Sequence, residues 1–337
     1  MASITSLLCA LTLAVSTCRA QTPPPTAAPP PQTAPPPTAA APPPPAITQI
    51  RKSVTFIKLL CKDGDKEWDV RGTGFFVSYP EPRLGKDWSV VYLVTNRHVA
   101  LCWNDSEQPM QVESISIRLN LRQAQGGSIA QDAFLNEHGN VAWVLPQDDS
   151  VDLAVLPLLP DETRFDFKYL PLGLLAGRDL LHQHRITEGE PVFFTGFFYQ
   201  FPGAKRMEPI VRQGIIAMMP EDKVPFLSRA EKVYLADVHV FGGNSGSPAF
   251  INLGGYHEGS MVLGDDYRLL GVVNANVSED EKFNLELATT VSGKGIANSG
   301  ISTIVPADEL KALLEDPRVQ KLRDDAVTAR GAQKTTP

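Results

Sequence analysis

Short runs of β-branched and aromatic residues recur from Ile47 to about Val305, and Gly, Pro, Asn and Asp separate them. This pattern is typical of β-strands. The clearest runs are Ser53–Leu60, Gly74–Val77, Ser89–Thr95, Ser114–Leu119, Pro191–Gly196, Ile210–Ile216 and Leu269–Asn274. Strands this short and this closely spaced favour antiparallel barrels or a sandwich over βαβ units. We therefore predict an all-β domain.

A helix is predicted near the C-terminal end of the sequence. Three leucines share one face of Asp308–Glu315, and Pro317 should end this helix. A further turn would extend the helical region to about 307–325. Residues 328–337 are expected to form a disordered tail.

The first twenty residues have the pattern of a targeting segment. An apolar run, Leu7–Val15, precedes small residues at Cys18 and Ala20, as in a signal peptide cleaved after about Ala20. The run is shorter than the ~20 residues that a membrane-spanning helix needs. We predict a secreted or periplasmic protein with no transmembrane segment in the mature chain. The alternatives are the flexible start of a cytosolic protein and a lipid anchor at Cys18, although Thr17 is unusual before a lipidated cysteine.

Residues 21–46 contain only Pro, Ala, Thr and Gln, and 13 of the 29 prolines of the chain lie here. Such a segment cannot bury a core, and its prolines favour the extended polyproline II conformation. We predict a semi-rigid linker, followed by a folded domain at 47–327. That length is sufficient for two packed barrels.

The charge and the cysteine content exclude several classes of partner. The sequence has 31 Lys and Arg against 38 Asp and Glu, and no basic run that would attract nucleic acid. Cys61 and Cys102 remain after the predicted signal peptide. In an oxidising compartment such a pair is more typical of a disulfide than of a metal site. The histidines are scattered, so we expect no metal and no cofactor.

Three separate segments carry candidate catalytic residues. His98 follows an apolar strand, Asp152 lies inside an apolar run, and Ser245 lies in the glycine-rich turn Phe241–Pro248. Each one alone has an ordinary structural explanation. Together they predict a triad in which the imidazole takes the proton of the serine and the carboxylate orients the imidazole. The N–H groups of Gly243 and Ser245 would then face the oxyanion. An α/β-hydrolase is excluded because its triad follows the order Ser, Asp, His.

These segments resemble motifs of the chymotrypsin-like serine proteases, specifically of the bacterial secreted branch. TNRHV at Thr95–Val99 and VDLAVL at Val151–Leu156 are similar to the histidine and aspartate motifs of the Deg-type (high-temperature-requirement) proteases. GNSGSP at Gly243–Pro248 is similar to the serine motif of the glutamyl endopeptidases. Gly72–Phe76 resembles the glycine-rich strand that precedes the histidine in this family.

The resemblance implies two antiparallel six-stranded β-barrels, at about 47–160 and 165–305, with a C-terminal helix. His98 and Asp152 would come from the first barrel and Ser245 from the second, meeting in the cleft between them. The implied function is a secreted serine endopeptidase that hydrolyses peptide bonds through an acyl-enzyme. The alternative is a catalytically silent barrel that binds peptides or a cell-surface partner, since a fold alone does not fix function.

Two departures from the digestive members of the family concern activation and cross-linking. Asn244 stands where those enzymes have an aspartate that pairs with a newly released N-terminus, so activation by that ion pair is not expected. Cys102 resembles the cysteine that follows their histidine, and Cys61 is its candidate partner.

The residues at the specificity positions match neither the pocket of trypsin-like enzymes nor that of the glutamyl endopeptidases. His239 stands where trypsin-like enzymes have an aspartate, and Val273 stands where glutamyl endopeptidases have a histidine. We therefore predict a preference for small or apolar side chains, with Asn274 and its strand binding the substrate main chain by β-augmentation. His239 would become a partner for anionic side chains if its loop shifted toward the pocket.

Overall fold

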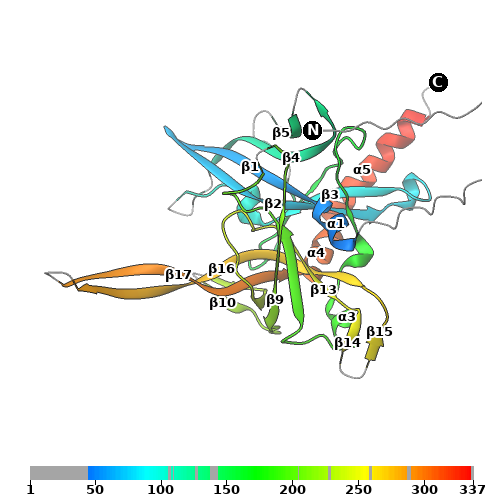
Figure 1. Cartoon of the computed structure of the whole chain (residues 1–337). Helices are drawn as coiled ribbons and strands as arrows, with labels where there is room; N and C mark the ends of the chain where they lie inside the picture. Colours follow the sequence, from blue (N-terminus) through cyan, green and yellow to red (C-terminus); the bar gives the residue numbers. More distant parts are fainter. Residues whose placement is uncertain are drawn as a thin grey trace, which may run out of the picture. The chain divides into compact units, whose positions relative to one another are not determined.

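Two antiparallel β-sheets, one from each half of the folded chain, form the framework of the domain (Figure 1). The computed structural model describes residues 45–334, except for gaps at 105–107, 109, 126–127, 137–142, 204, 227–228, 258–259 and 287–289. The predicted signal peptide and the predicted linker up to residue 44 lie outside the described residues. Helix α1, Ala46–Ile50, begins where the linker was expected to end.

The first sheet contains seven strands, six of which follow the order β5-β4-β1-β2-β3-β6. Neighbours along this path are antiparallel, and the short β7 pairs in parallel with β2. The strands are β1 (Val54–Asp63), β2 (Lys66–Pro80), β3 (Ser89–Thr95), β4 (Gln111–Gln125), β5 (Ser128–Asn136), β6 (Ala154–Pro157) and β7 (Leu170–Pro171). Among the described pairings, β5 and β6 stay at opposite ends of the six-stranded path and do not close it.

The second sheet is a closed barrel in the order β12-β17-β16-β13-β8-β9. Its strands are β8 (Pro191–Gly196), β9 (Ile210–Met218), β12 (Tyr234–Asp237), β13 (Pro248–Asn252), β16 (Tyr267–Glu286) and β17 (Thr290–Pro306). Two small hairpins accompany it, namely β10 (Val224–Phe226) with β11 (Arg229–Glu231) and β14 (Gly255–His257) with β15 (Ser260–Val262). The predicted all-β class is confirmed, and of the two six-stranded barrels predicted, the described pairings close the second.

Strands β16 and β17 continue past the barrel as a two-stranded hairpin, drawn in orange in Figure 1. Among the described pairings, β13 adjoins β16 only at Tyr267–Val272, and β12 adjoins β17 only at Ile301–Ile304. The hairpin pairing nevertheless runs on to Glu286 opposite Thr290. The strand predicted to end at Asn274 is therefore more than twice as long as expected.

Buried side chains fill the interior of each sheet and the space between the two. Phe75 and Phe76 are both fully buried although they are neighbours on β2. Successive strand residues point to opposite faces, so Phe76 enters the core of the first sheet and Phe75 enters the core shared with the second. On β16, Leu269 packs in the shared core and Leu270 inside the barrel. This double burial explains the continuous apolar runs in the sequence.

Five helices and three 3-10 turns connect or cover the sheets in the described part of the chain. The helices after α1 are α2 (Arg97–Ala100), α3 (Arg178–Gln183), α4 (Ala307–Leu314) and α5 (Pro317–Lys334). The 3-10 turns are η1 (Arg51–Ser53), η2 (Pro82–Leu84) and η3 (Leu172–Leu174). Helix α4 inserts its leucine face into the shared core, as its pattern predicts. No helix among the described residues combines the length and apolar character that crossing a membrane requires.

The C-terminal region differs from the prediction in one respect. The helix with the three leucines ends before Pro317, as predicted, and Pro317 begins the separate helix α5, because a proline at the first turn of a helix lacks only an N–H that would be unpaired anyway. The expected disordered tail from Thr328 is wrong as far as Lys334, since α5 is helical to that residue. Its distal part packs on the first half of the chain, where the guanidinium of Arg330 lies 3.4 Å from the ring centroid of Trp88.

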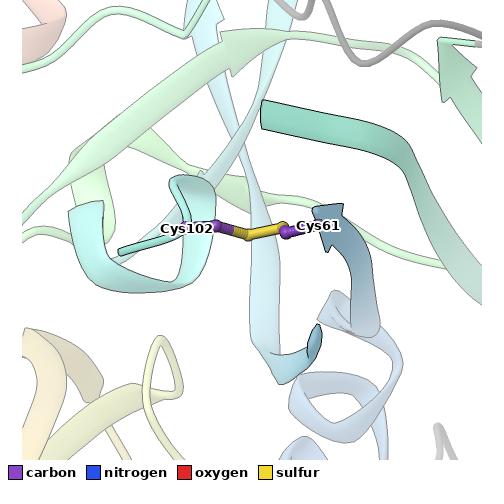
Figure 2. The surroundings of a disulfide bond; sticks show 2 residues. All are labelled: Cys61 and Cys102. Carbon is purple, nitrogen blue, oxygen red and sulfur yellow. A yellow bond between two sulfur atoms is a disulfide. The ribbon is translucent and has the colours of Figure 1, made fainter. Parts of the chain in front are cut away.

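The predicted pair Cys61 and Cys102 forms a disulfide with a Cα–Cα distance of 6.4 Å (Figure 2). Cys61 lies on β1, and Cys102 lies two residues after α2. The bond therefore attaches the short helix α2 to the middle of the first sheet. Both cysteines are buried.

Candidate active site

His98 is placed by the end of a buried strand. Strand β3 ends at Thr95, Asn96 is extended, and the chain then enters the single turn of α2, in which His98 is the second residue. The carbonyl of Asn96 accepts the N–H groups of Val99 and Ala100, at 3.1 and 3.0 Å, which closes this turn. The imidazole is 40% exposed, so it lies at the surface while its backbone is fixed to the core.

Asp152 lies two residues before β6 and is only 3% exposed. Its Oδ2 lies 2.6 Å from Nδ1 of His98, and its Oδ1 accepts the backbone N–H of His98 at 3.1 Å. An ionised carboxylate can only accept hydrogen bonds, so the proton of a neutral imidazole facing it lies on Nδ1 and the ring lone pair on Nε2. A lone pair on Nε2 is what a general base needs.

Two neighbours of His98 also bind the segment that carries Asp152. The Nδ2 group of Asn96 donates to the backbone oxygen of Asp152 at 2.9 Å. Arg97 donates to the carbonyl of Pro146 at 2.9 Å and to the carboxylate of Asp149 at 2.6 Å. Three consecutive residues of the histidine turn are therefore attached to one loop, which fixes the geometry of the His98–Asp152 pair.

A charged group ties the same loop to the second half of the chain. Asp148 accepts hydrogen bonds from the hydroxyl and the N–H of Ser150, at 2.6 and 3.0 Å. Lys223 and Lys232, which flank the β10–β11 hairpin, lie 3.2 and 3.5 Å from its carboxylate. The hydrogen bonds of Ser150, reinforced by Lys223, hold the pKa of Asp148 well below its usual range. The carboxylate therefore stays ionised as a partner for both lysines.

Ser245 lies in the turn that leads into β13, between two glycines with positive φ. Gly243 has φ +97° and Gly246 has φ +86°, and residues with a Cβ rarely adopt such backbone angles. A Cβ at Gly243 would also lie 2.8 Å from the carbonyl oxygen of Phe197. The hydroxyl of Ser245 donates to the carbonyl of Asn274 on β16 at 2.8 Å.

The glycine-rich part of β2 brings the serine turn and the histidine turn together. The N–H of Thr73 donates to the carbonyl of Ser245 at 2.8 Å. A Cβ on the adjacent Gly72 would meet both the side chain of Val99 and, at 3.3 Å, the carbonyl oxygen of Ser245. Val99 directly follows His98, so the absence of a side chain at Gly72 lets the two predicted halves of the site approach each other.

Asn244 is fully buried, and its amide group is used entirely within the turn region. Its Oδ1 accepts the N–H of Phe241 at 2.9 Å, and its Nδ2 donates to the carbonyl of Phe197 at 2.9 Å. A neutral amide needs no counter-ion when it is buried and hydrogen-bonded.

The predicted specificity residues occupy different environments. His239 is exposed and stacks on the ring of Phe241, with ring centroids 6.4 Å apart. Val273 is fully buried, and its N–H and carbonyl already pair with Ser247 and Gly246, at 2.8 Å each. The side chain of Val273 therefore has no surface for a substrate, and the site proposed below does not include it.

Asn274 reaches Ser245 through its backbone, whereas its side chain turns away. The Nδ2 group of Asn274 donates to the carboxylate of Glu231 at 2.9 Å, and both side chains are buried. Sequence reasoning missed Glu231 because nothing in the RAE sequence around it marks a buried carboxylate. It also missed Thr73, whose position between Gly72 and Gly74 in a strand was the available signal.

Within the described residues, no group of three or more His, Cys, Asp or Glu side chains has a metal-binding arrangement. The candidate site contains an imidazole, a carboxylate, a hydroxyl and a glycine-rich turn, and acyl transfer uses groups of these kinds.

A comparison with protein families assigns the chain to one of them. The family model of the trypsin-like peptidase domain matches residues 72–255, which is more than half of the chain. No curated protein matches the sequence significantly. Similar solved structures include the HtrA-type protease AlgW with a tripeptide and the apo protease domain of MamO from Magnetospirillum magneticum. Both are 15% identical over 80% of this chain, with TM-scores of 0.43 and 0.42, and the match spans 62% of AlgW and 100% of the MamO domain. On the strength of the family match, this chain belongs to the trypsin-like peptidase domain family.

Proposed function

We propose that the protein is a secreted serine endopeptidase in which Ser245 is the nucleophile, His98 the general base and Asp152 the residue that orients His98. The observation that carries the proposal is the pair of hydrogen bonds from His98 to the buried carboxylate of Asp152. A surface ion pair would not need a carboxylate that is 3% exposed. A catalytic imidazole does need one, because the carboxylate fixes its tautomer and stabilises the imidazolium.

In the proposed reaction, Oγ of Ser245 attacks the carbonyl carbon of the scissile peptide bond while Nε2 of His98 takes the hydroxyl proton. The resulting imidazolium is stabilised by Asp152 and gives its proton to the leaving amine as the C–N bond breaks. A water molecule then attacks the acyl-enzyme, with His98 again acting as the base. This step releases the carboxylic acid and restores the hydroxyl of Ser245.

The N–H groups of Gly243 and Ser245 are the proposed donors to the tetrahedral oxyanion. In the described part of the chain, neither N–H donates to a protein acceptor. The carbonyls of their own peptide units are occupied on the opposite side, where Gly242 O accepts from Tyr199 and Asn244 O accepts from Ser247. Removal of one such donor typically costs about 10²–10³ in rate.

The proposed substrates are proteins or peptides, and small or apolar side chains are preferred near the scissile bond. Exposed aromatic rings border the serine turn, at Tyr199 and Phe241. The ring of Tyr199 lies directly over Gly242, where a Cβ would meet it at 2.5 Å. Such rings offer apolar contact area, and the main chain of β16 next to Asn274 is the candidate partner for the substrate backbone.

Secretion is supported by the disulfide between Cys61 and Cys102, since such bonds persist mainly in oxidising compartments. Together with the predicted signal peptide, this bond supports the proposal that the enzyme acts outside the cytosol.

The proposal is tested by labelling with a serine-directed fluorophosphonate, comparing the wild type with Ser245→Ala and His98→Ala. We expect the probe to label the wild type only. In digestion of a peptide library read by mass spectrometry, we likewise expect only the wild type to cleave peptides. The library also reports the side-chain preference. Equal lack of labelling in the folded wild type and in Ser245→Ala would overturn the peptidase proposal.

The second candidate function is a catalytically silent protein that binds peptides or a cell-surface partner. The observation that favours it is the hydrogen bond from the Ser245 hydroxyl to the carbonyl of Asn274, which directs the proton to an atom that cannot act as a base. A folded wild type that binds library peptides without cleaving them would support this alternative.

A further inference from the structure

The back of the serine turn is held by a residue of the first sheet that has no part in the proposed chemistry. Thr73 lies on β2 and is fully buried. Its N–H donates to the carbonyl of Ser245 at 2.8 Å, and its hydroxyl donates to the carbonyl of Gly243 at 2.6 Å. We propose that Thr73 is a positioning residue that fixes the oxyanion-binding conformation of this turn, an inference that rests on the proposed function.

The direction of the Thr73 hydroxyl hydrogen follows from its two partners. The N–H of Phe197 donates to Oγ1 of Thr73 at 2.9 Å, and an amide N–H can only donate. The carbonyl of Gly243 can only accept, so the hydroxyl hydrogen points to it. A single hydroxyl therefore joins the serine turn to the residue that follows β8 and attaches both to the first sheet.

Three consecutive carbonyls of the turn are each held by a separate donor. Gly242 O accepts from the N–H of Tyr199 at 3.2 Å, Gly243 O from Thr73, and Asn244 O from the N–H of Ser247 at 3.0 Å. In a trans peptide the N–H points away from the C=O of the same unit. The first and third contacts therefore direct the N–H groups of Gly243 and Ser245.

Thr73 holds the middle peptide, which links these two N–H groups. Rotation of that peptide changes ψ of Gly243 and φ of Asn244, and so changes the angle between the two N–H donors. Gly243 has no Cβ to resist such a rotation, because glycine has access to many backbone conformations. The N–H of this peptide, on Asn244, donates to the carbonyl of Phe241 within the turn at 3.0 Å, and the hydroxyl of Thr73 restricts the peptide from outside the turn. Among the three donors, Thr73 alone contributes a side chain, so substitution can remove it.

Thr73 is also connected to the histidine side of the site. The hydroxyl of Thr95 donates to the carbonyl of Thr73 at 2.8 Å. Thr95 is the last residue of β3, three residues before His98. The backbone of one residue thus lies between the strand that leads to the proposed base and the turn that leads to the proposed oxyanion donors.

The decisive variant is Thr73→Val, which removes the hydroxyl with little change in shape. Thr73→Ser keeps the hydroxyl, and Thr55→Val is the matched control. Thr55 is also fully buried, lies on β1 opposite Gly74, and donates its hydroxyl to the carbonyl of Arg118 at 3.1 Å. The control therefore removes one hydrogen bond of a buried threonine hydroxyl on the neighbouring strand, without a contact to the turn.

We expect Thr73→Val to lower kcat by about 10- to 100-fold with KM changed less than about 3-fold, since misplaced donors weaken transition-state binding selectively. Thr73→Ser should stay within about 3-fold of the wild type, as should Thr55→Val. A wild-type kcat in folded Thr73→Val, or an equal loss in Thr55→Val, would overturn the proposal.

Should Thr73→Val not fold, Thr95→Val provides the second variant, with an expected loss in kcat of about 3- to 10-fold at unchanged KM. A wild-type kcat in folded Thr95→Val would then count against the proposal.

Hydrogen exchange at the amides of residues 243–245 gives a readout that does not depend on activity. Faster exchange in Thr73→Val than in the wild type and Thr55→Val supports the positioning role, and unchanged exchange contradicts it. A wild type that neither labels nor cleaves would overturn the proposed peptidase function. The exchange data would still decide whether Thr73 fixes the turn.

Discussion

Asp152 receives two hydrogen bonds from the same residue, one from the backbone and one from the imidazole of His98. The backbone contact fixes where the carboxylate lies relative to the chain, and the ring contact fixes how the imidazole is rotated. Because Asp152 is almost completely buried, neither contact competes strongly with water. The pair is therefore preorganised before any substrate binds.

Substitutions at this pair should separate the base from the residue that orients it. In Asp152→Asn, an amide that donates to Nδ1 of His98 would favour the wrong tautomer, and we expect kcat/KM to fall about 10⁴-fold. His98→Ala removes the base itself and should lose at least as much, about 10⁴- to 10⁶-fold. Steady-state assays on a cleaved library peptide would measure both, with near-ultraviolet circular dichroism as the control for folding. A folded Asp152→Asn variant with near-wild-type activity would contradict the assigned role.

The pH dependence of kcat/KM should follow the imidazole. His98 must be neutral at Nε2 to accept the proton of Ser245, so activity should be low when the ring is protonated and rise as it deprotonates. The expected observation is a rate that rises with pH within the range from about pH 5 to pH 8, in which histidine side chains ordinarily change charge. A rate profile that is flat from about pH 5 to pH 8 would argue against His98 as the base.

The residues of the site differed in how far sequence could predict them. His98, Asp152 and Ser245 lie in local motifs whose neighbours are constrained by the same chemistry, so the sequence predicted them as a set. Thr73 contacts Gly243 across 170 positions through a hydroxyl and a carbonyl. Every residue has a backbone carbonyl, so such a contact leaves no signature at one of its two ends. Val273 was placed by alignment with a pocket strand, but the register of β16 turns its side chain into the barrel.

Among the elements, α2 depends most on a covalent link. The disulfide attaches Cys102, four residues after His98, to Cys61 on β1 across a sequence separation of 41. Closing a loop of that length stabilises the fold by about 4 kcal/mol in the chain-entropy model. We expect the Cys61→Ala, Cys102→Ala double variant to lose about 2–4 kcal/mol in urea unfolding. Its kcat should also fall, because the turn with His98 loses its attachment. An unchanged unfolding midpoint would contradict this account.

Helix α5 is attached to the first sheet by a buried arginine. Arg323 donates to the carbonyl of Leu314 at 2.8 Å and to the hydroxyl of Tyr92 at 3.2 Å, and it lies 4.0 Å from the ring centroid of Tyr79. Burial raises the pKa of Tyr92, so its hydroxyl stays neutral and can accept this bond. We expect Arg323→Ala to cost about 2–4 kcal/mol in urea unfolding, because it leaves two buried acceptors unpaired.

The matched control for this arginine is Lys321→Ala, an exposed position on the same helix. It should change the free energy of unfolding by less than about 0.5 kcal/mol. Equal stability of Arg323→Ala and the wild type would show that the packing of α4 alone holds this end of the chain.

The same arginine explains why α5 was underestimated from sequence. Its buried stripe includes Val319 and Arg323, and a charged residue on the inner face hides the apolar periodicity that predicts helices. β3 and β8, by contrast, begin and end where predicted, since turn-forming residues bound their apolar runs. In β16 the sequence becomes polar after Asn274, so no apolar pattern marked the strand that continues to Glu286.

At the scale of the whole domain, the two sheets are joined by a shared core and by polar contacts at the site. Phe75 from β2 and Phe250 from β13 belong to the same buried cluster. Thr73 and the Asp148–Lys223 pair connect the sheets at the edges of this cluster. The proposed site thus lies beside contacts that join the two sheets, so loss of the packing between them should remove activity together with stability.

Acid should therefore act on the whole molecule through carboxylates that are ionised in the folded state. Hydrogen bonds hold the pKa values of four carboxylates below the usual range. The carboxylates and their donors are Glu81 with Arg83, Asp148 with Ser150, Asp161 with Thr163 and Asp316 with Arg318. A depressed folded pKa means that the unfolded chain binds protons first as pH falls. The stabilisation is fully present above the unfolded values, near about 4, and is lost progressively below them.

Glu81 offers the sharpest test of this linkage. It is buried and makes a two-point contact with Arg83, at 2.7 Å each, while Arg83 also reaches Asp324 on α5 at 2.8 Å. We expect Glu81→Gln to lower the free energy of unfolding at pH 7 by about 1.5–3 kcal/mol. Its stability should then fall less steeply than that of the wild type between pH 5 and about pH 3, because one linked proton is gone. Urea unfolding across this pH range measures both effects, with exposed Glu221→Gln as the control for the loss of one charge. If the free energy of unfolding fell equally steeply with decreasing pH in Glu81→Gln and the wild type, protonation of Glu81 would not contribute to acid unfolding.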